Sequence, residues 1–448
     1  MSNRAAATGQ FQLKWILSCN SVNALQVVLA AIFQILLARY FGASLFTDAY
    51  LVSIIMLDFI STLGAFSAEL FIQHYNDLRV KNNPDEAKRL YQVVFNLSLL
   101  VALAFLIITI IMMSPMIRLF APGFDAQRLT ALKSLFGILT FGLICKSLIG
   151  VNNSLLNAEM KFVLPYWIAL LTPGFNILSL LLFAEDYGIS CIGVSIVLSG
   201  ITGLGVQQVY ISRALKIQLG YELWHPKVTD LIRQTLSLKI GQHLWDLKDP
   251  VTAYILSLFP TGTVSLYFYG ARLIHLLFGI TNAQALQIFH SMVSRLVAER
   301  EFLAVRTLFK RILLMTTGVF VIALTVVSVI LPQILPLLLG VKFTGEELRI
   351  IHLVFLALIP FYVILSVESP LVNITIAMKQ SVTTIKIGAI FIIVFAGSAF
   401  LLKDSFGIYA IPVALMVAQM QNLIMYGLNV RQMLRAGPAC RPSGAERP

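Results

Sequence analysis

Residues 90–114 read LYQVVFNLSLLVALAFLIITIIMMS, an apolar run without a charged side chain. A helix needs about 20 apolar residues to cross the hydrocarbon core of a bilayer, which is about 30 Å thick. Of the 448 residues in the chain, 58% are hydrophobic and 12% are charged, whereas soluble domains are about 45–50% apolar and about 25% charged. Globular cores stop growing beyond roughly 250–300 residues, so they cannot bury this surplus. The sequence predicts an all-α polytopic membrane protein and excludes a soluble enzyme.

Twelve apolar runs of this kind follow one another along the chain, and none shows the alternation with period two that a membrane β-barrel requires. The expected transmembrane helices lie near residues 15–38, 46–73, 90–114, 128–154, 162–184, 189–212, 230–258, 263–290, 307–333, 348–372, 380–402 and 406–430.

The basic residues predict the orientation of these helices. The chain has 33 Lys and Arg and a net charge of +12. If both termini share one side, that side holds 21 basic residues and the opposite side six. Cytoplasmic loops carry such an excess, so both termini are predicted to be cytoplasmic. Because topology explains the positive charge, we expect contact with membrane lipid and no nucleic-acid partner.

The two halves of the chain resemble each other. Residues 188–194 (GISCIGV) match residues 407–413 (GIYAIPV) at an offset of 219 residues. Gly123 matches Gly340, and Arg39 matches Ser257, at offsets of 217 and 218 residues. These offsets span six expected helices, which makes the halves parallel repeats of the kind found in transporters, with the substrate path between them.

The predicted organisation follows from this repeat. We expect a cytoplasmic segment (1–14), a first six-helix lobe (15–215), a cytoplasmic loop (216–229), a second six-helix lobe (230–430) and a cytoplasmic tail (431–448). The tail from residue 437 onward is rich in Pro, Gly and charge, and is expected to be disordered.

Ionisable residues at membrane depth are candidates for function, because each costs roughly 2.5–3.5 kcal/mol to insert. In SLKIGQHLWDLKDPV (237–251), helical spacing places Lys239, His243 and Asp246 on one face. Pro250 is expected to kink this helix. The set is either a self-compensating packed interface or the hydrated face of a substrate or proton path.

Four further acidic and basic positions are candidates. Asp58 and Glu69 have the spacing of one helical stripe, although Glu69 could simply be solvated near the cytoplasmic end. Arg272 lies in the apolar stretch YFYGARLIHLL, and its planar guanidinium suits either an anionic substrate or a structural carboxylate partner. Glu368 is a candidate for a protonatable or ion-coupled carboxylate, with a structural role as the alternative.

Signatures of soluble enzymes are missing from the sequence. There is no HExxH, GxxxxGK[ST] or GxSxG, and neither the histidines nor the four cysteines have metal-ligand spacing. We therefore expect no enzymatic activity, metal or cofactor. Coupling to the membrane potential or to a monovalent cation stays open.

Several segments of the sequence together resemble those of a known protein family. They are ARYFGASLFTDAY (38–50), GAFS (64–67), LFAPGF (119–124), LLNAEMKFVLPYWIALLTPGFNI (155–177) and SLFPTGTVSLYFYGARL (257–273). This set resembles the MurJ/MviN family of lipid II flippases, within the superfamily of multidrug, oligosaccharidyl-lipid and polysaccharide exporters. The resemblance implies two six-helix lobes around a central cavity, and a location in the bacterial inner membrane.

The resemblance also implies a substrate, an undecaprenyl-pyrophosphate-linked saccharide held by cavity arginines. Arg39, Asp48 and Arg272 stand where the family has Arg, Asp and Arg. Two family arginines are replaced by Phe33 and Val27 in this chain. Ser61–Thr62 occupy the region of a family arginine pair, and the last two helices of the lipid II flippases are absent. These departures favour an exopolysaccharide or O-antigen repeat over lipid II as cargo.

The sequence thus predicts a flippase for a lipid-linked oligosaccharide that works by alternating access, with glycan-assembly proteins as further partners. The alternatives are an ion-coupled multidrug exporter of the same superfamily and a membrane glycan polymerase or ligase. The expected substrate-binding residues are Arg272, Lys239, Lys146 and Arg39, and the expected coupling or gating residues are Asp48, Asp58, Glu69, Asp246 and Glu368.

Overall fold

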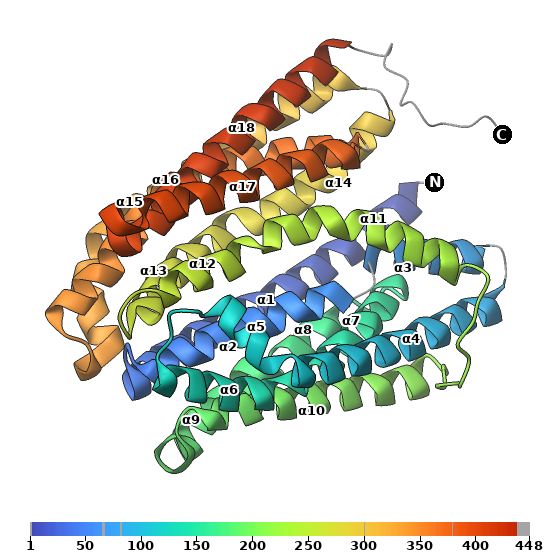
Figure 1. The fold of residues 1–448 in the computed structure, drawn as a ribbon. Coiled ribbons are helices and arrows are strands. Elements are labelled where there is room, and N and C mark those ends of the chain that lie inside the picture. Colours follow the sequence, from blue (N-terminus) through green and yellow to red (C-terminus); the bar gives the residue numbers. More distant parts are fainter. Residues whose placement is uncertain (1, 65–67, 81–82, 300, 379, 437–448) are drawn as a thin grey trace. The chain divides into compact units, whose positions relative to one another are not determined.

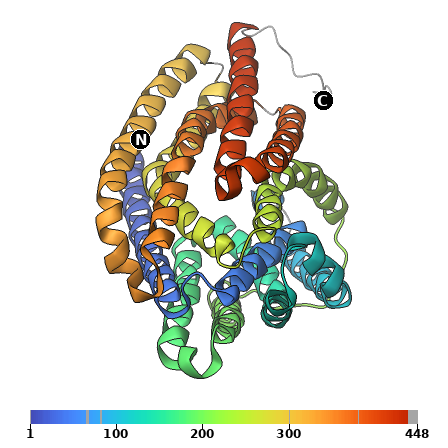
Figure 2. The same ribbon diagram turned by 60° about the vertical axis from the view of Figure 1, so that its left-hand side comes forward.

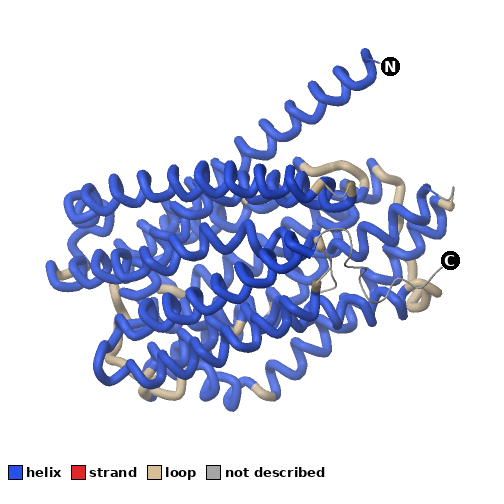
Figure 3. The backbone as a smooth tube through the Cα atoms, turned by 90° about the horizontal axis from the view of Figure 1, so that it is seen from above, coloured by secondary structure: helices blue, strands red, loops and turns tan. Residues whose placement is uncertain are grey.

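The computed structural model describes residues 2–64, 68–80, 83–299, 301–378 and 380–436. These residues form helices joined by short turns, and no strand occurs among them (Figures 1 and 3). The expected all-α class is confirmed. The predicted disorder of residues 437–448 falls outside the described residues.

The chain divides into two compact units, Met1–Lys239 with Leu339–Lys342, and Ile240–Leu338 with Phe343–Pro448. The helices that begin in unit 1 are α1 (Ser2–Phe41), α2 (Leu45–Gly64), α3 (Ala68–Val80), α4 (Pro84–Ile111), α5 (Met113–Phe120), α6 (Ala126–Thr140), α7 (Gly142–Ala158), α8 (Val163–Ala169), α9 (Leu171–Tyr187), α10 (Ser190–Ala214) and α11 (Val228–Asp246).

Unit 2 contains most of the remaining helices. They are α12 (Lys248–Ser257), α13 (Thr263–Phe278), the π-helix η1 (Gly279–Ala283), α14 (Gln284–Ala298), α15 (Phe302–Leu339), α16 (Gly345–Ala377), α17 (Ser381–Phe406), the 3₁₀ helix η3 (Gly407–Tyr409) and α18 (Ala410–Ala436). The 3₁₀ helix η2 (Gly340–Lys342) belongs to unit 1.

Ten segments of the described chain are long and apolar enough to cross a membrane. One of them, Val382–Leu434, contains both α17 and α18. The expected seventh helix, 230–258, is not among the ten, because charged residues interrupt its apolar sequence. A multi-pass membrane protein is confirmed, and the number of twelve transmembrane helices stays a prediction.

The seventh expected helix is interrupted where Pro250 predicts a disturbance. Helix α11 ends at Asp246 and α12 begins at Lys248, with Leu247 between them. Pro250 has no N–H to donate to the carbonyl of Asp246, four residues earlier. Backbone bonds nearby are kept, since Leu247 donates to the His243 carbonyl and Val251 donates to the Leu247 carbonyl, both at 3.0 Å.

Unit 1 is built on apolar packing between α3, α4, α7 and α10. Its core contains large side chains with almost no exposed surface, and a buried polar contact joins two of its helices. The Tyr91 hydroxyl of α4 donates to Oδ1 of Asn152 on α7 at 2.8 Å. The core includes Phe71, Tyr75, Tyr91, Val94, Leu148, Leu155, Leu156 and Ile211.

Unit 2 has its own core, in which α16, α17 and α18 pack against one another (Figure 2). Helix α14 joins them and contributes Phe289 and Val293. The remaining core side chains come from α15 to α18 and include Val305, Leu371, Ile374, Ile387, Tyr426 and Val430.

The sequence repeat is also a repeat of backbone geometry. Gly188 follows α9 and Gly407 follows α17, and both have φ of +55°. Each N–H closes the preceding helix, from Gly188 to the Ala184 carbonyl and from Gly407 to the Lys403 carbonyl. Glycine adopts this conformation without the steric cost that a Cβ imposes. The GIxxIxV match therefore marks the same helix–turn–helix corner in each unit.

We expect Gly407→Ala to destabilise the protein by about 1–3 kcal/mol, because alanine is strained at this φ. No neighbouring atom lies within 4 Å of the position that a Cβ would take, so the effect is conformational. Gly397→Ala, inside α17 and also in open space, is the matched control and should be neutral or stabilising by roughly 0.5–1 kcal/mol. Thermal unfolding in detergent measures both, and equal behaviour of the two variants would contradict the backbone argument.

Candidate functional site

A polar turn of α2 in unit 1 carries Asp58, Ser61 and Thr62. The Ser61 hydroxyl donates to the Asp58 carbonyl at 2.9 Å, and the Thr62 hydroxyl donates to the Phe59 carbonyl at 2.8 Å. Main-chain carbonyls of α2 thus accept the hydrogen bonds of both hydroxyls. Each hydroxyl oxygen keeps lone pairs, and the Asp58 carboxylate projects from the same turn.

Lys146 of α7 reaches this turn and forms an ion pair with Oδ1 of Asp58. The lysine side chain is 45% exposed and the aspartate 58% exposed. Such open ion pairs contribute about 0–1 kcal/mol, since solvent screens them and both side chains lose freedom. An incoming anion can therefore exchange with Asp58 at small cost.

Lys239 of α11 reaches the same turn from another side. Its Nζ donates to the Thr62 carbonyl at 3.0 Å. This hydrogen bond to a peptide carbonyl positions the ammonium group beside the polar turn of α2. Two lysines that the sequence analysis selected, 93 positions apart in the chain, thus meet at one turn of α2.

A cavity of about 190 Å³ lies beside this turn. Water occupies roughly 30 Å³ per molecule in the liquid, and drug-sized ligands need about 300–1,000 Å³. The cavity therefore suits a phosphoryl-sized group and is too small for an oligosaccharide. Its walls combine hydroxyls, one ammonium group and apolar surface, contributed by Ser61, Thr62, Ala68, Phe71, Val94, Lys146, Ser147, Gly150, Val151 and Ser154.

Arg39 and Asp48, two further predicted residues of unit 1, are not among the residues that line this cavity. Arg39 is exposed in the last turn of α1. Its aliphatic chain passes Gly340 of η2, and the Cγ of Arg39 lies 3.5 Å from the position that a Cβ on Gly340 would take. Asp48 has no exposed surface in the first turn of α2, where a helix dipole favours a carboxylate. Glu69 lies on α3, and its side chain is outside the described set, so its stripe with Asp58 stays a prediction.

Arg272 lies on α13 in unit 2 with a half-buried side chain. Its Nη1 has no hydrogen-bond partner in the described part of the chain. Lys248, Asp249 and Arg272 all lie within electrostatic reach of His275, whose Nδ1 is 3.4 Å from the Tyr362 hydroxyl. A guanidinium nitrogen with an unused donor is a suitable contact for an anion.

The acidic residues after Lys239 have close neighbours of their own. Oδ2 of Asp246 is 4.0 Å from Nδ1 of His243. Lys248 pairs with Asp249 at 3.2 Å, and its ammonium lies 5.3 Å from the centre of the Trp245 ring. The His243–Asp246 contact is a charge pair only when the imidazole is protonated, and Lys248 and Asp249 are not part of the predicted Lys–His–Asp face, so both interpretations of this face stay predictions.

Glu368 is buried on α16 of unit 2, with 3% of its surface exposed. Oε2 of its carboxyl group has no hydrogen-bond partner among the described residues. The sequence analysis selected this residue because it is a lone carboxylate in an apolar helix, and the structure gives it a buried environment.

Sequence reasoning missed a polar seam that fastens residues 218–225 to the start of α4. The signal was present as a helical stripe on α4, Arg89, Gln92 and Asn96, at spacings of three and four residues. Burial lowers the pKa of His225 more than the neighbouring Glu86 raises it. The contacts of the seam are Gln92 with the Gln218 carbonyl, Asn96 with the carbonyls of Gly220 and Glu222, Arg89 with the Glu222 carboxylate, and His225 with Glu86.

Solved structures with the same fold are membrane transporters. The chain is similar to a lipid II flippase MurJ in an inward closed conformation, with a TM-score of 0.79, 17% identity, and coverage of 92% of this chain and 87% of that chain. It is similar to an inward-facing multidrug resistance MATE family transporter, with a TM-score of 0.75, 15% identity, and coverage of 94% and 98%. It is also similar to a MOP superfamily transporter from Pyrococcus furiosus, with a TM-score of 0.63, 14% identity, and coverage of 94% of this chain and 93% of that chain. The chain therefore has the fold shared by the MurJ and MATE transporters.

The sequence places the chain more narrowly within this class. The family model for the lipid II flippase MurJ matches residues 37–439. The chain therefore belongs to the MurJ lipid II flippase family, which consists of transporters and not enzymes. The comparison with curated proteins gives no significant match.

We expect Asp58 and Lys146 to be weakly coupled. In a double-mutant cycle of Asp58→Asn and Lys146→Gln, the interaction energy should stay below about 1 kcal/mol, because both side chains are open to their surroundings. Unfolding of the four proteins in mixed micelles measures this energy. A coupling of about 3 kcal/mol or more would show that the pair is locked and that Lys146 is not free to bind an anion.

Proposed function

We propose that this chain flips an undecaprenyl-pyrophosphate-linked oligosaccharide across the bacterial inner membrane by alternating access. The observation that carries the proposal is the meeting of Lys146 and Lys239 at one polar turn of α2, beside a cavity of about 190 Å³. Family membership supports the transport of a lipid-linked glycan.

The chemistry of the cargo explains why such a site is needed. A pyrophosphate that leaves water loses its hydration, and hydrogen bonds to charged donors are worth about 1.5–3 kcal/mol each. Lys146 and Lys239 supply the positive charge, and the hydroxyls of Ser61 and Thr62 line the adjoining wall. The lipid tail stays in the bilayer and the sugars need a larger volume than this cavity, so the site is assigned to the phosphoryl groups.

Lysines take the place of arginines in this assignment. Phe33, at a position where the family has arginine, is 4% exposed and packs edge-on against Tyr50, with ring centroids 6.3 Å apart. The α1–α2 contact is therefore apolar at this point. A lysine is a point charge without the planar fork of arginine, and it selects its anion less strictly. The lysines do not distinguish the cargoes, because all of them carry the same pyrophosphate. The preference for an exopolysaccharide or O-antigen repeat over lipid II rests on the departures from the family's arginines, such as Phe33.

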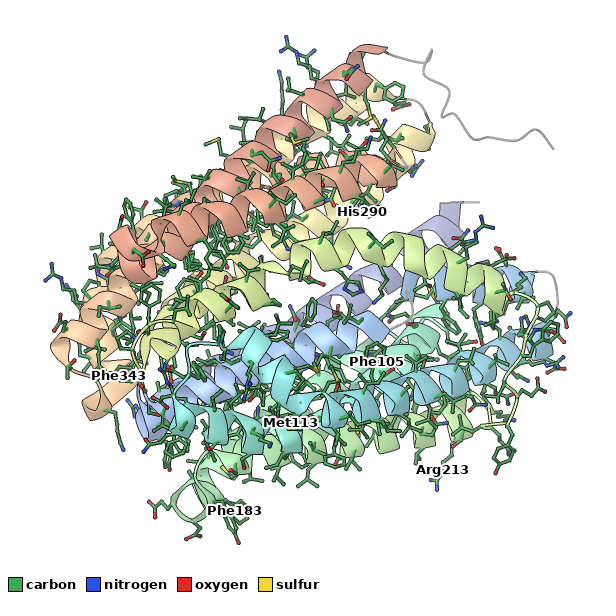
Figure 4. All side chains as sticks on the ribbon, in the orientation of Figure 1. Phe105, Met113, Phe183, Arg213, His290 and Phe343 are labelled. Carbon is green, nitrogen blue, oxygen red and sulfur yellow. The ribbon has the colours of Figure 1, made fainter. Side chains whose placement is uncertain are left out.

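The orientation belongs to the same proposal, with both termini in the cytoplasm. Phe183 and Arg213 project at opposite ends of the α9–α10 pair (Figure 4), so the basic end with Arg213 is separated from the end that carries Phe183 and the acidic residues Glu185 and Asp186. The basic end corresponds to the predicted cytoplasmic side. A carboxyl-terminal reporter that is active only in the periplasm would contradict this orientation.

The test of function uses purified protein in vesicles that contain a fluorescent undecaprenyl-pyrophosphate oligosaccharide. We expect the label to appear in the outer leaflet with its mass unchanged, and Lys146→Gln to reduce the rate at least about tenfold, as loss of one charged hydrogen bond predicts. Lys161→Gln, an exposed lysine just after α7, is the control and should transport normally. A change in the mass of the glycan would instead indicate a polymerase or ligase, and parallel vesicles with lipid II compare the two cargoes.

Arg272 gives a second prediction in the same assay. We expect Arg272→Ala to be close to inactive and Arg272→Lys to be impaired, because the ammonium group cannot reproduce the planar pair of donors. Both variants should insert into the membrane normally, which the amount of folded protein on size exclusion checks. Wild-type transport by Arg272→Ala would rule out the anion contact and leave Lys146 and Lys239 as the binding groups.

A further inference from the structure

Unit 2 holds a carboxyl group that the proposed phosphate site does not use. Glu368 is 3% exposed, and its Oε2 has no hydrogen-bond partner in the described chain. A buried ionised carboxylate without a partner costs several kcal/mol. The group must therefore carry a proton or hold a cation in this conformation.

The nearest polar group is an amide on the facing helix. Asn422 of α18 is 2% exposed, and its side-chain amide lies within reach of the Glu368 carboxyl. The amide oxygen Oδ1 of Asn422 lacks a partner among the described residues, as does Oε2 of the glutamate. Two acceptor oxygens thus lie unsatisfied in one buried acid–amide pair.

The helices packed around this pair contribute little charge to it. The influences on the Glu368 carboxyl are burial and the Asn422 amide, and Tyr426 lies within electrostatic reach on the same face of α18. Tyr426 is part of the apolar core of unit 2 and is itself buried. Other titratable residues of the neighbouring helices are not among these influences. They include Lys386, Lys403 and Asp404 on α17, His290 and Arg295 on α14, Arg272 and His275 on α13, and Arg431 on α18.

The backbone beside Glu368 is weakened. Pro370 has no N–H to donate to the carbonyl of Ser366, four residues earlier. The Ser366 hydroxyl lies 3.1 Å from the Thr317 hydroxyl of α15, which ties this turn of α16 to a neighbouring helix. A helix that lacks one backbone bond at a buried titratable group can bend there when the group changes charge.

We propose that Glu368 and Asn422 form a proton-binding pair. Oε2 of Glu368 carries the proton and donates it to Oδ1 of Asn422, while the amide N–H of Asn422 donates to Oε1. One proton, taken from and returned to the aqueous phase, satisfies both unpartnered oxygens. A metal ion would need several more oxygen ligands, and no group of three or more His, Cys, Asp or Glu in the described chain could hold one.

The consequence for transport rests on the proposed function. Loss of the proton would leave a charged carboxylate in the packed interior of unit 2, which disfavours this packing of α16 on α18. A ligand shifts a two-state equilibrium when it binds one state better than the other, and the proton would act as such a ligand.

The first experiment does not depend on transport. Infrared spectra of the purified protein in lipid should show the C=O stretch of a protonated carboxylic acid at neutral pH, absent in Glu368→Gln and retained in Glu346→Gln, an exposed glutamate of the same helix. Asn422→Leu should keep the band and shift its frequency. An ionised Glu368 at neutral pH, or a band that Na⁺ removes when it replaces K⁺, would overturn the proton assignment.

The second experiment tests coupling in the flippase vesicles with the voltage clamped by K⁺ and valinomycin. A pH difference of about one unit, a tenfold ratio of proton activity, should change the wild-type rate several-fold and leave the rate of Glu368→Gln unchanged. An equal response of both proteins would overturn the coupling role. If the wild type moves no lipid-linked glycan, the proposed function fails while the infrared band still decides the proton pair.

Discussion

A charge inside a membrane protein must be paired, wetted or neutralised, and this constraint governs every functional group described above. Asp58 and Lys146 satisfy it by pairing in an open position. Lys239 satisfies it in part by resting on a peptide carbonyl. Among the described residues Glu368 is neither wetted nor paired at Oε2, because its surface is buried and this oxygen lacks a partner. The three cases differ in how easily a ligand can replace the existing arrangement.

Much of the fold was predictable because apolar length and glycine geometry are local properties. The apolar runs gave the all-α membrane class, and the match of residues 188–194 with 407–413 identified corners that share a φ of +55°. The count of twelve helices stays a prediction, because the seventh carries charged residues that lower its hydropathy, and Pro250 interrupts its hydrogen bonding.

The pairing of residues was not predictable in the same way. Asp58 and Lys146 were selected separately as ionisable residues in apolar helices, but 88 positions separate them, and no periodicity links α2 to α7. Glu368 was predicted as a candidate functional residue because it is a lone carboxylate in an apolar helix. Asn422 was not predicted, because its amide is uncharged and does not differ from other polar residues in apolar helices. The seam on α4 was visible as a polar stripe, but its partners are main-chain carbonyls of a loop, which have no side-chain signature.

In the proposed function, the two units respond to different chemical signals. The lysines of unit 1 are proposed to bind an anion through an exposed pair, so that the cargo itself displaces Asp58. The acid–amide pair of unit 2 changes its charge when it gains or loses a proton and requires no cargo. If both events bias the same two-state equilibrium, thermodynamic linkage makes them reciprocal, and the factor by which protonation changes cargo affinity equals the factor by which cargo changes proton affinity. Separate sites in separate units can thus be coupled without a continuous chain of contacts, because each needs only a different affinity for the two states.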